Sequence, residues 1–290
     1  MVYYTGREVV VYYISEPAEG QDPTSNPNVH KVLGQLIDKE YLYNPTPVMT
    51  QKTGDVDPAA LKYGIATPSA TLRLELDDLD GRDFVYNYMA TSTQPTTFQI
   101  ILKANDGTII CRLVGCKIKT ATFAARNFSG TSASYGPATL DLTVWAINIL
   151  YTALTNPSYN TASATVISYS DVTVQRGGVS VTDWWECGFT VDYNLLAMPT
   201  YNNSDARWEI NTIKVANRTW SVYYIQPTQG SDSADYSAAR AATLINIVLL
   251  ISARTFTFTN CVMNSLNVKS PVTGMSGKRF DWTPTSISIA

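Results

Sequence analysis

Apolar and polar residues alternate along much of the chain, which is the pattern of β-strands with one buried face. The segment 256–268, FTFTNCVMNSLNV, changes its buried face twice. Its apolar positions are Phe256, Phe258, Cys261, Met263, Leu266 and Val268. The segment 111–123, CRLVGCKIKTATF, changes face at the same places. An extra residue in a β-bulge shifts the alternation by one, so we expect two long strands that bend at bulges.

The two segments align when Cys116 is placed opposite Cys261, an offset of 145 residues. The repeat-signature positions are Gly115, Cys116, Ile118 and Thr120 in the first segment and Asn260, Cys261, Met263 and Ser265 in the second. Upstream, TLRLEL (71–76) corresponds to TWSVYYI (219–225) at an offset of 148, and YNPTPVMT (43–50) corresponds to YNLLAMPT (193–200) at 150. Any two strands share simple alternation, but shared irregularities indicate that one β-rich unit occurs twice.

The predicted fold is mainly β, with two tandem units at 1–154 and 165–290 and an Asn/Ser/Thr-rich linker at 155–164. The elements expected in both units are a short helix at 80–92 and 233–244, an apolar strand at 96–104 and 243–251, and a closing strand at 138–147 and 279–289. Asp80 is predicted to cap the first helix.

The two units differ most at their starts. The second opens with two Val-rich strands around Arg176-Gly177-Gly178, which predicts a tight hairpin. In the first unit the matching turn is a Pro/Asn/Ser/Gly-rich loop at about 15–30, and long loops in compact units are usually functional or disordered. The segment after it, 29–40, also fits an amphipathic helix, but the repeat alignment favours a strand.

The charge of the chain and its few reactive residues exclude several classes of function. Charged residues make up 16% of the chain and the net charge is −3, so no basic field would hold nucleic acid. His30 is the single histidine, which excludes most triads and multi-histidine metal sites, and we expect it at the surface. The cysteines, Cys111, Cys116, Cys187 and Cys261, form no C-x-x-C pair and are expected to be buried free thiols.

No catalytic, cofactor-binding or metal site emerges from the motifs. ELDDLDG (75–81) resembles half a calcium loop, but no bidentate Glu follows, and a strand leading into a capped helix explains it equally well. The N-terminus has no signal-peptide pattern, and the longest apolar run, 241–252, is too short to cross a bilayer. We therefore expect a protein without cofactor or enzymatic activity, made in a cytoplasm.

An open β-sheet must protect its edges, and one solution is to pair them with the next subunit around a closed ring. Tandem duplication lets half as many chains close the same ring. The enlarged loop then supplies an arm that stacks one ring on the next, which makes a tube. The loop positions predicted for stacking are Pro17, Glu19, Gln21, Asp22, Asn26 and Asn28.

The strand order, the helix before an apolar strand and the Gly/Asn-Cys strands resemble the tail tube proteins of tailed viruses, once in each half. The resemblance implies β-sandwich or half-barrel units whose inner sheets join into a continuous barrel around a lumen. For a duplicated member it implies trimers that form pseudo-hexameric rings in the virion tail. Its implied partners are further copies of the chain, the tape-measure protein, tail terminator and distal tail proteins, and viral DNA that passes without specific binding; no membrane is involved.

Other classes remain open from the residues alone. A capsid or surface-layer protein of two β-domains would also be large, sparsely charged and without catalytic residues. A carbohydrate-binding adhesion module would need exposed tryptophans, for which Trp184, Trp185 and Trp208 are candidates. An enzyme that uses dispersed carboxylates is a further alternative.

Overall fold

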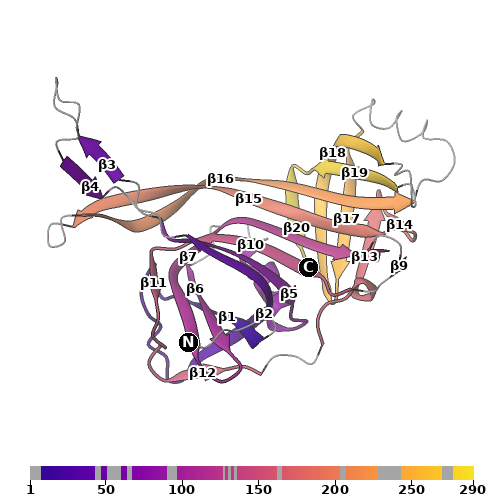
Figure 1. Ribbon diagram of the computed structural model, residues 1–290. Helices are drawn as coiled ribbons and strands as arrows, with labels where there is room; N and C mark the ends of the chain where they lie inside the picture. The colour runs from indigo at the N-terminus through magenta and orange to yellow at the C-terminus, as the bar shows by residue number, and fades with distance from the viewer. Residues whose placement is uncertain are drawn as a thin grey trace.

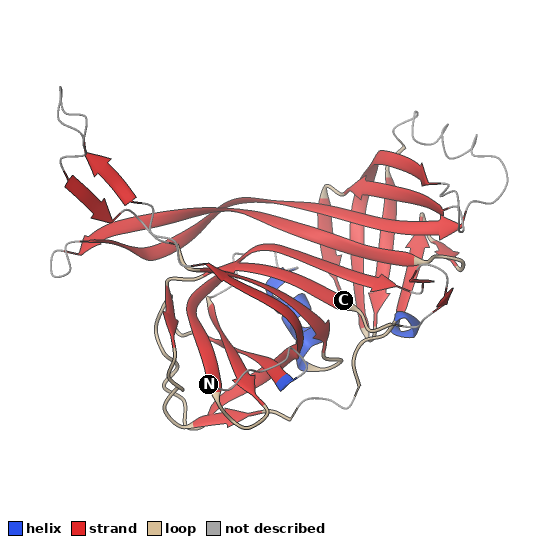
Figure 2. Ribbon diagram, viewed as in Figure 1, coloured by secondary structure: helices blue, strands red, loops and turns tan. Residues whose placement is uncertain are grey.

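The computed structural model describes residues 8–42, 47–50, 60–63, 67–89, 97–126, 128–129, 132–133, 136–161, 165–202, 207–227, 243–269 and 277–290. The protein is mainly β, as the sequence pattern predicts (Figure 1, Figure 2). Most strands belong to one continuous sheet that runs through both halves of the chain.

The N-terminal half forms a closed six-stranded barrel (Figure 1). Its strands are β1 (Val9–Ser15), β2 (Asn28–Leu42), β5 (Ser69–Leu76), β6 (Phe98–Ala104), β7 (Ile109–Arg126) and β10 (Thr139–Trp145). They pair in the order β10-β5-β2-β1-β6-β7, and β10 pairs with β7 to close the barrel. The predicted strand at 29–40 is confirmed by β2.

Alternating leucines fill the barrel. In β5 every second residue, from Ala70 to Leu76, is buried, and β10 buries Leu140, Leu142 and Val144 in the same way. The helical segment α1 (Asp80–Phe84) with η2 (Val85–Met89) adds Phe84 and Tyr88 to this core, where both rings contact Phe98. The first predicted helix is therefore present.

The prediction that Asp80 caps this helix is wrong. The Asp77 carboxylate accepts the backbone N–H groups of Leu79 and Asp80, each at 2.9 Å. Asp80 is instead turned toward β2 and the linker, where it accepts the Val32 N–H and the Asn160 amide. The N–H groups of Arg82 and Asp83, which an Asp80 cap would have satisfied, donate instead to the carbonyls of Asp77 and Leu79. Asp80 is therefore free to join other elements.

The C-terminal half contributes β13 (Val172–Arg176), β14 (Val179–Val181), β15 (Glu186–Asn202), β16 (Arg207–Pro227), β17 (Ile245–Ile251), β18 (Arg254–Lys269), β19 (Gly277–Thr283) and β20 (Ser286–Ile289). They pair in the order β15-β16-β19-β18-β17-β13-β14, and β20 pairs with β18. Gly177 and Gly178 form the predicted tight hairpin with φ of 58° and 83°, values that glycine adopts without strain.

The predicted bulges are present in both long strands. The β6–β7 ladder shifts register between Phe98 and Ile100, and the β17–β18 ladder shifts between Ile245 and Ile247. The residues in the bulged strands are Gly115, with φ of 67°, and Asn260, with φ of 49°. A second shift follows in each strand, one residue long, at Lys119 in β7 and Asn264 in β18. The irregularities therefore recur at the same spacing in both halves.

Shorter elements complete the fold. They are β3 (Pro47–Thr50), β4 (Ala60–Tyr63), β8 (Phe128–Ser129), β9 (Ser132–Ala133), β11 (Asn148–Leu150), β12 (Pro157–Tyr159) and η3 (Tyr169–Asp171). β12 lies within the predicted linker and pairs in parallel with the start of β2, so this part of the linker is attached to the first barrel. The helix predicted at 233–244 falls almost wholly outside the described residues.

The predicted surface position of His30 is wrong. Its side chain is fully buried, stacks on Tyr159 of β12 with ring centroids 4.6 Å apart, and contacts the Ser158 carbonyl through Nδ1. Burial lowers the pKa of His30 below its usual value. All four cysteines are buried and free, as predicted.

Candidate self-assembly interface

An antiparallel sheet of eight strands crosses both halves of the chain, in the order β2-β5-β10-β7-β15-β16-β19-β18 (Figure 1). One face carries the apolar residues of the core. Along β15, for example, Phe189 and Val191 are buried on that face, whereas Asp192 and Asn194 on the opposite face are exposed. The sheet is therefore a two-sided wall with one apolar and one polar face.

The halves join at the pairing of β7 with β15, which we call the internal seam. Seven residue pairs, from Arg126 opposite Glu186 to Thr120 opposite Asp192, form it. Arg126 and Glu186 make an ion pair at 3.0 Å, and the hydroxyls of Thr122 and Thr190 lie 3.0 Å apart. Backbone pairing and matched polar side chains thus hold the N-terminal barrel and the C-terminal strand set together.

Two edges of this sheet are open. Residues 36–42 of β2 pair with β5 on one side, and residues 262–269 of β18 pair with β19 on one side. In the part of the chain that the structure describes, no strand pairs with the other side of either segment. Open edges present rows of unpaired backbone donors and acceptors that pair readily with another strand.

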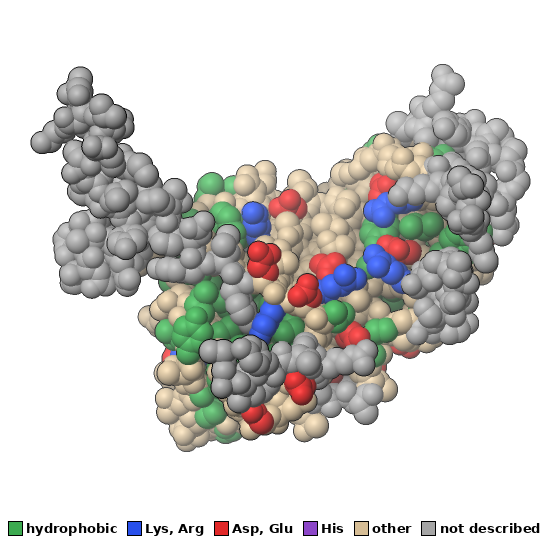
Figure 3. Space-filling model, viewed as in Figure 1, with side chains coloured by type: hydrophobic (Ala, Val, Ile, Leu, Met, Phe, Trp, Pro, Cys, Tyr) green, Lys and Arg blue, Asp and Glu red, His purple; other side chains and the backbone are tan. Residues whose placement is uncertain are grey.

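The polar face of the sheet is rich in Thr, Ser and Asn, and its arginines lie beside carboxylates. Arg73 is 3.5 Å from Asp141, and Arg279 is 2.9 Å from Asp281, in addition to the Arg126–Glu186 pair. Figure 3 shows acidic and basic side chains interspersed across the middle of the visible face, without a large patch of one sign.

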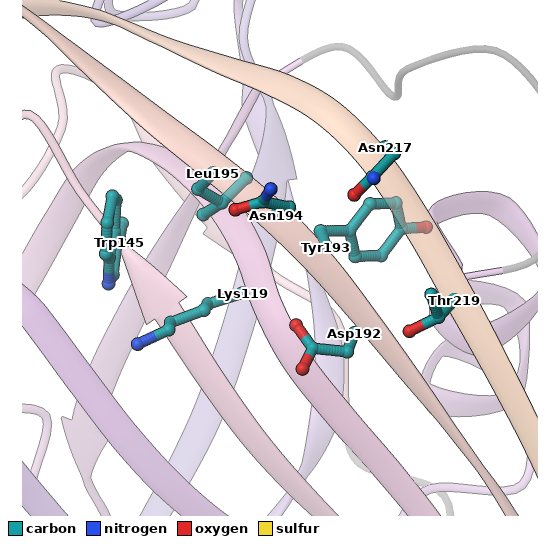
Figure 4. Close-up of a pocket in the computed structure, with 8 residues that line it drawn as sticks. All are labelled: Lys119, Trp145, Asp192, Tyr193, Asn194, Leu195, Asn217 and Thr219. Carbon is teal, nitrogen blue, oxygen red and sulfur yellow. The ribbon is translucent and has the colours of Figure 1, made fainter.

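A groove of about 470 Å³ lies where β10 ends beside β15 and β16. It is lined by Lys119, Trp145, Asp192, Tyr193, Asn194, Leu195, Asn217 and Thr219 (Figure 4). The Lys119 ammonium lies 5.3 Å from the centre of the Trp145 ring. The groove holds one cation and one carboxylate on an open surface, which gives it no recognisable catalytic arrangement.

The loop predicted to stack rings is fastened to its own chain at several points. Glu16 is buried and accepts the N–H groups of Gly115 at 2.8 Å and Gly20 at 3.0 Å; burial raises the pKa of Glu16, and these hydrogen bonds oppose the rise. Asp22 accepts hydrogen bonds from the buried Arg112 and from Gln99. Burial alone would raise the pKa of Asp22, but these bonds lower it.

The other predicted stacking residues divide into exposed and internal ones. Pro17, Gln21 and Asn26 are exposed. Asn28 is buried and donates to the Thr155 carbonyl at 2.8 Å, so a stacking role does not fit its position. Glu19 is half-buried and accepts the Ile213 N–H of β16. The stacking role of the exposed residues stays a prediction.

The signature positions occupy matching places in β7 and β18. Cys116 and Cys261 lie directly after the first bulge in the core, and burial raises the pKa of both thiols, to about 11 for Cys261. Ile118 is buried and Met263 packs against the same core. Ser265, on the polar side, donates to Asp281 at 2.9 Å, and Thr120 takes part in the internal seam. Buried, protonated thiols are structural and not reactive.

The most prominent projecting feature was not apparent in the sequence. Beyond Asp192, β15 and β16 continue as a two-stranded ribbon that runs past the N-terminal barrel and projects beyond it (Figure 1). Leu196 and Met198 are exposed on this ribbon. β16 has 21 residues and β7, the longest strand of the N-terminal barrel, has 18, so an unbroken strand pattern longer than the barrel needs is the signal that could have revealed the ribbon.

No family model matches the chain, and no curated protein matches it. Several solved structures resemble part of it, including the following three. The tail of an empty gene transfer agent particle, refined with C6 symmetry, aligns with 42% of this chain and 96% of its own at 8% identity and a TM-score of 0.33. A native gene transfer agent virion aligns with 42% of this chain and 96% of its own at 7% identity and a TM-score of 0.30. The sixfold-symmetrised baseplate of the anti-feeding prophage aligns with 41% of this chain and 90% of its own at 9% identity and a TM-score of 0.30. TM-scores of this size do not establish a shared fold over the whole chain.

None of the described helices is long and apolar enough to cross a membrane. The described residues also contain no group of three or more His, Cys, Asp or Glu side chains placed to hold a metal ion.

Proposed function

We propose that the protein is a structural subunit of a virion tail tube, which assembles edge to edge into rings. The observation that carries this proposal is the eight-stranded sheet with an open edge at each end. Because the two edges differ, pairing β18 of one chain with β2 of the next is a head-to-tail contact, and such contacts generate closed rings when the rotation permits.

The proposal includes a tandem duplication. The closed strand set of the first half and the strand set of the second half have the same pairing order, and the positive-φ residue and both register shifts recur at an offset of 145 residues. If each half is one unit, three chains supply six units, and a trimeric ring has pseudo-sixfold symmetry. A unit of about half the chain is also the length over which the tail structures above align.

In such a ring the polar face of the sheet lines the lumen. Its arginines lie beside carboxylates, so a passing DNA backbone meets few uncompensated positive charges. The proposed role is thus to enclose the tape-measure protein during assembly and later to conduct DNA, with tail terminator and distal tail proteins at the ends. It is not enzymatic and needs no cofactor.

One observation weakens the alternative of a carbohydrate-binding module. Trp184 is buried and packs against Tyr169 with ring centroids 4.0 Å apart, so it does not offer an exposed platform to a sugar. Trp185 is half-buried, and the side chain of Trp208 lies outside the described residues.

Purified protein tests the proposed function directly. Sedimentation velocity and negative-stain microscopy over a concentration series should show rings, and tubes at the highest concentrations. A protein that stays monomeric throughout would contradict the proposal. Substituting Pro17, Gln21 and Asn26 together should leave rings intact but shorten tubes; tubes of normal length would remove the loop from the stacking contact.

A further inference from the structure

We propose that neighbouring chains join in the register of the internal seam, which places Lys269 of β18 opposite Glu40 of β2 in the next chain. This inference rests on the proposed function and specifies how one copy recognises another. The internal seam serves as the template: it shows how the edge of one half pairs with the edge of the other.

The first step relates β7 to β18. Gly115 and Asn260 both have positive φ, and both ladders shift register at these residues and again four residues later. The strands therefore correspond at 260 − 115 = 145 residues. At this offset Thr122 corresponds to Asn267, and Ala124 corresponds to Lys269.

The second step follows the ladders across the sheet from β7 to β2 and from β18 to β15. Residues that pair with equivalent residues are themselves treated as equivalent, strand by strand. The matched residues are Thr143 with Asp281, Leu142 with Phe280, Leu72 with Tyr224, and Lys39 with Cys187. Thus β2 and β15 correspond at 187 − 39 = 148 residues.

The strands on the other side of each half, β6 and β1 in the first and β17 and β13 in the second, give nearly the same offset. Leu102 pairs with Val11, and its counterpart Leu249 pairs with Val174. Val11 in turn lies opposite Gly34, and Val174 lies opposite Val181, which gives 181 − 34 = 147. The two offsets, 148 and 147, differ by one residue. The segment 182–185, which connects β14 to β15, accounts for that residue.

The register of the seam between chains follows. Ala124 lies opposite Gly188 in the internal seam, so Lys269 lies opposite Glu40 between chains. Thr122 lies opposite Thr190, so Asn267 lies opposite Leu42. Directly opposed residues of antiparallel strands share one face, and opposite charges there stabilise the pair. Because Ala124 and Gly188 are uncharged, the charge pair is specific to the seam between chains, and a charged edge also disfavours pairing in other registers.

Charge reversal tests the register. Lys269→Glu and Glu40→Lys each place like charges opposite one another and should raise the concentration at half-assembly roughly fivefold to tenfold. The double variant restores opposite charges and should assemble like the wild type. Lys31→Glu, on an exposed part of β2 outside the seam, is the matched control and should have no effect. Failure of the double variant to recover would overturn the register.

Disulfide trapping gives a second, independent readout. Asn267→Cys with Leu42→Cys should form covalent oligomers on mild oxidation, because the equivalent Thr122 and Thr190 hydroxyls lie only 3.0 Å apart. Thr122→Cys with Thr190→Cys should close within one chain and is the positive control. Asn267→Cys with Glu40→Cys, two residues out of register, should link poorly. Rings that are trapped only by the shifted pair would overturn the register but leave the proposed function standing. Absence of any assembly by the wild type would overturn both.

Discussion

Glu19 and Ile213 are joined by a hydrogen bond, although 194 residues separate them in the chain. The Glu19 carboxylate accepts the backbone N–H of Ile213 at 2.7 Å, and the same oxygen lies 3.8 Å from the Lys117 ammonium. The bond connects the N-terminal loop to β16, beyond the segment of that strand that pairs with β19. The middle of the ribbon, where Ile213 pairs with Ala197, is therefore held by the loop of the other half.

Removing this acceptor should loosen the ribbon. Glu19→Ala leaves the Ile213 N–H without its partner and should lower the free energy of unfolding by about 1–2 kcal/mol. Amide hydrogen exchange at Ile213 should accelerate, which mass spectrometry can measure. Glu19→Gln keeps an acceptor and should restore most of the protection. Equal exchange in all three proteins would show that the bond does not hold the ribbon.

Substitution of the two positive-φ residues should change stability by very different amounts. A Cβ at Gly115 would lie 2.7 Å from Ile147, in addition to the strain of φ at 67°. Gly115→Ala should therefore cost about 2 kcal/mol or more, measured by denaturant unfolding. Asn260→Gly relieves strain in the matching bulge and should change stability by less than about 0.5 kcal/mol. A tolerated Gly115→Ala would contradict the predicted bulge geometry.

Stability should fall as the pH drops below about 6.5, the usual pKa of histidine. Burial favours the neutral form of His30, so its folded-state pKa is lowered and the unfolded chain binds more protons in this range. The loss should be at most about 1.4 kcal/mol per pH unit for one group. His30→Phe should flatten the difference in Tm between pH 7.5 and pH 5.5. Because His30 is the single histidine, an unchanged pH dependence in this variant would show that another group causes the loss of stability.

The paired charges of the polar face should control its affinity for DNA. Wild-type protein should not retard double-stranded DNA at physiological salt. Replacing Asp141, Glu186 and Asp281 by their amides frees three arginines and should produce binding whose log–log salt slope is roughly −2.7. Adding Arg→Gln changes at positions 73, 126 and 279 should abolish that binding. Strong retardation by the wild type would be inconsistent with a low-friction lumen.

Features that leave a local trace could be predicted from the sequence. The parity changes around Gly115 and Asn260 predicted the bulges, because one extra residue in a strand always inverts the alternation. The Gly177-Gly178 hairpin was also predictable, because a tight turn with positive φ favours glycine and the two glycines are visible in the sequence.

Features that depend on distant partners could not be predicted. His30 is buried because Tyr159, far along the chain, stacks on it, and its neighbours in sequence give no sign of this. The sequence pattern aligns TLRLEL with TWSVYYI at an offset of 148. The strand pairings make Leu72 equivalent to Tyr224, an offset of 224 − 72 = 152, so the predicted offset is wrong by four residues. Alternation matches at any even shift, so only the pairing partners distinguish these registers.

The mass of the assembled ring tests the central claim most directly. Mass photometry of freshly diluted assemblies should show a species at three times the 31.9 kDa chain mass, and class averages of the same sample should show six similar lobes around a hollow centre. A ring of six chains with six lobes would contradict the two-units-per-chain account, and a ring of six chains with twelve lobes would contradict the trimer. A closed dimer or a lasting monomer would contradict ring assembly through the open edges.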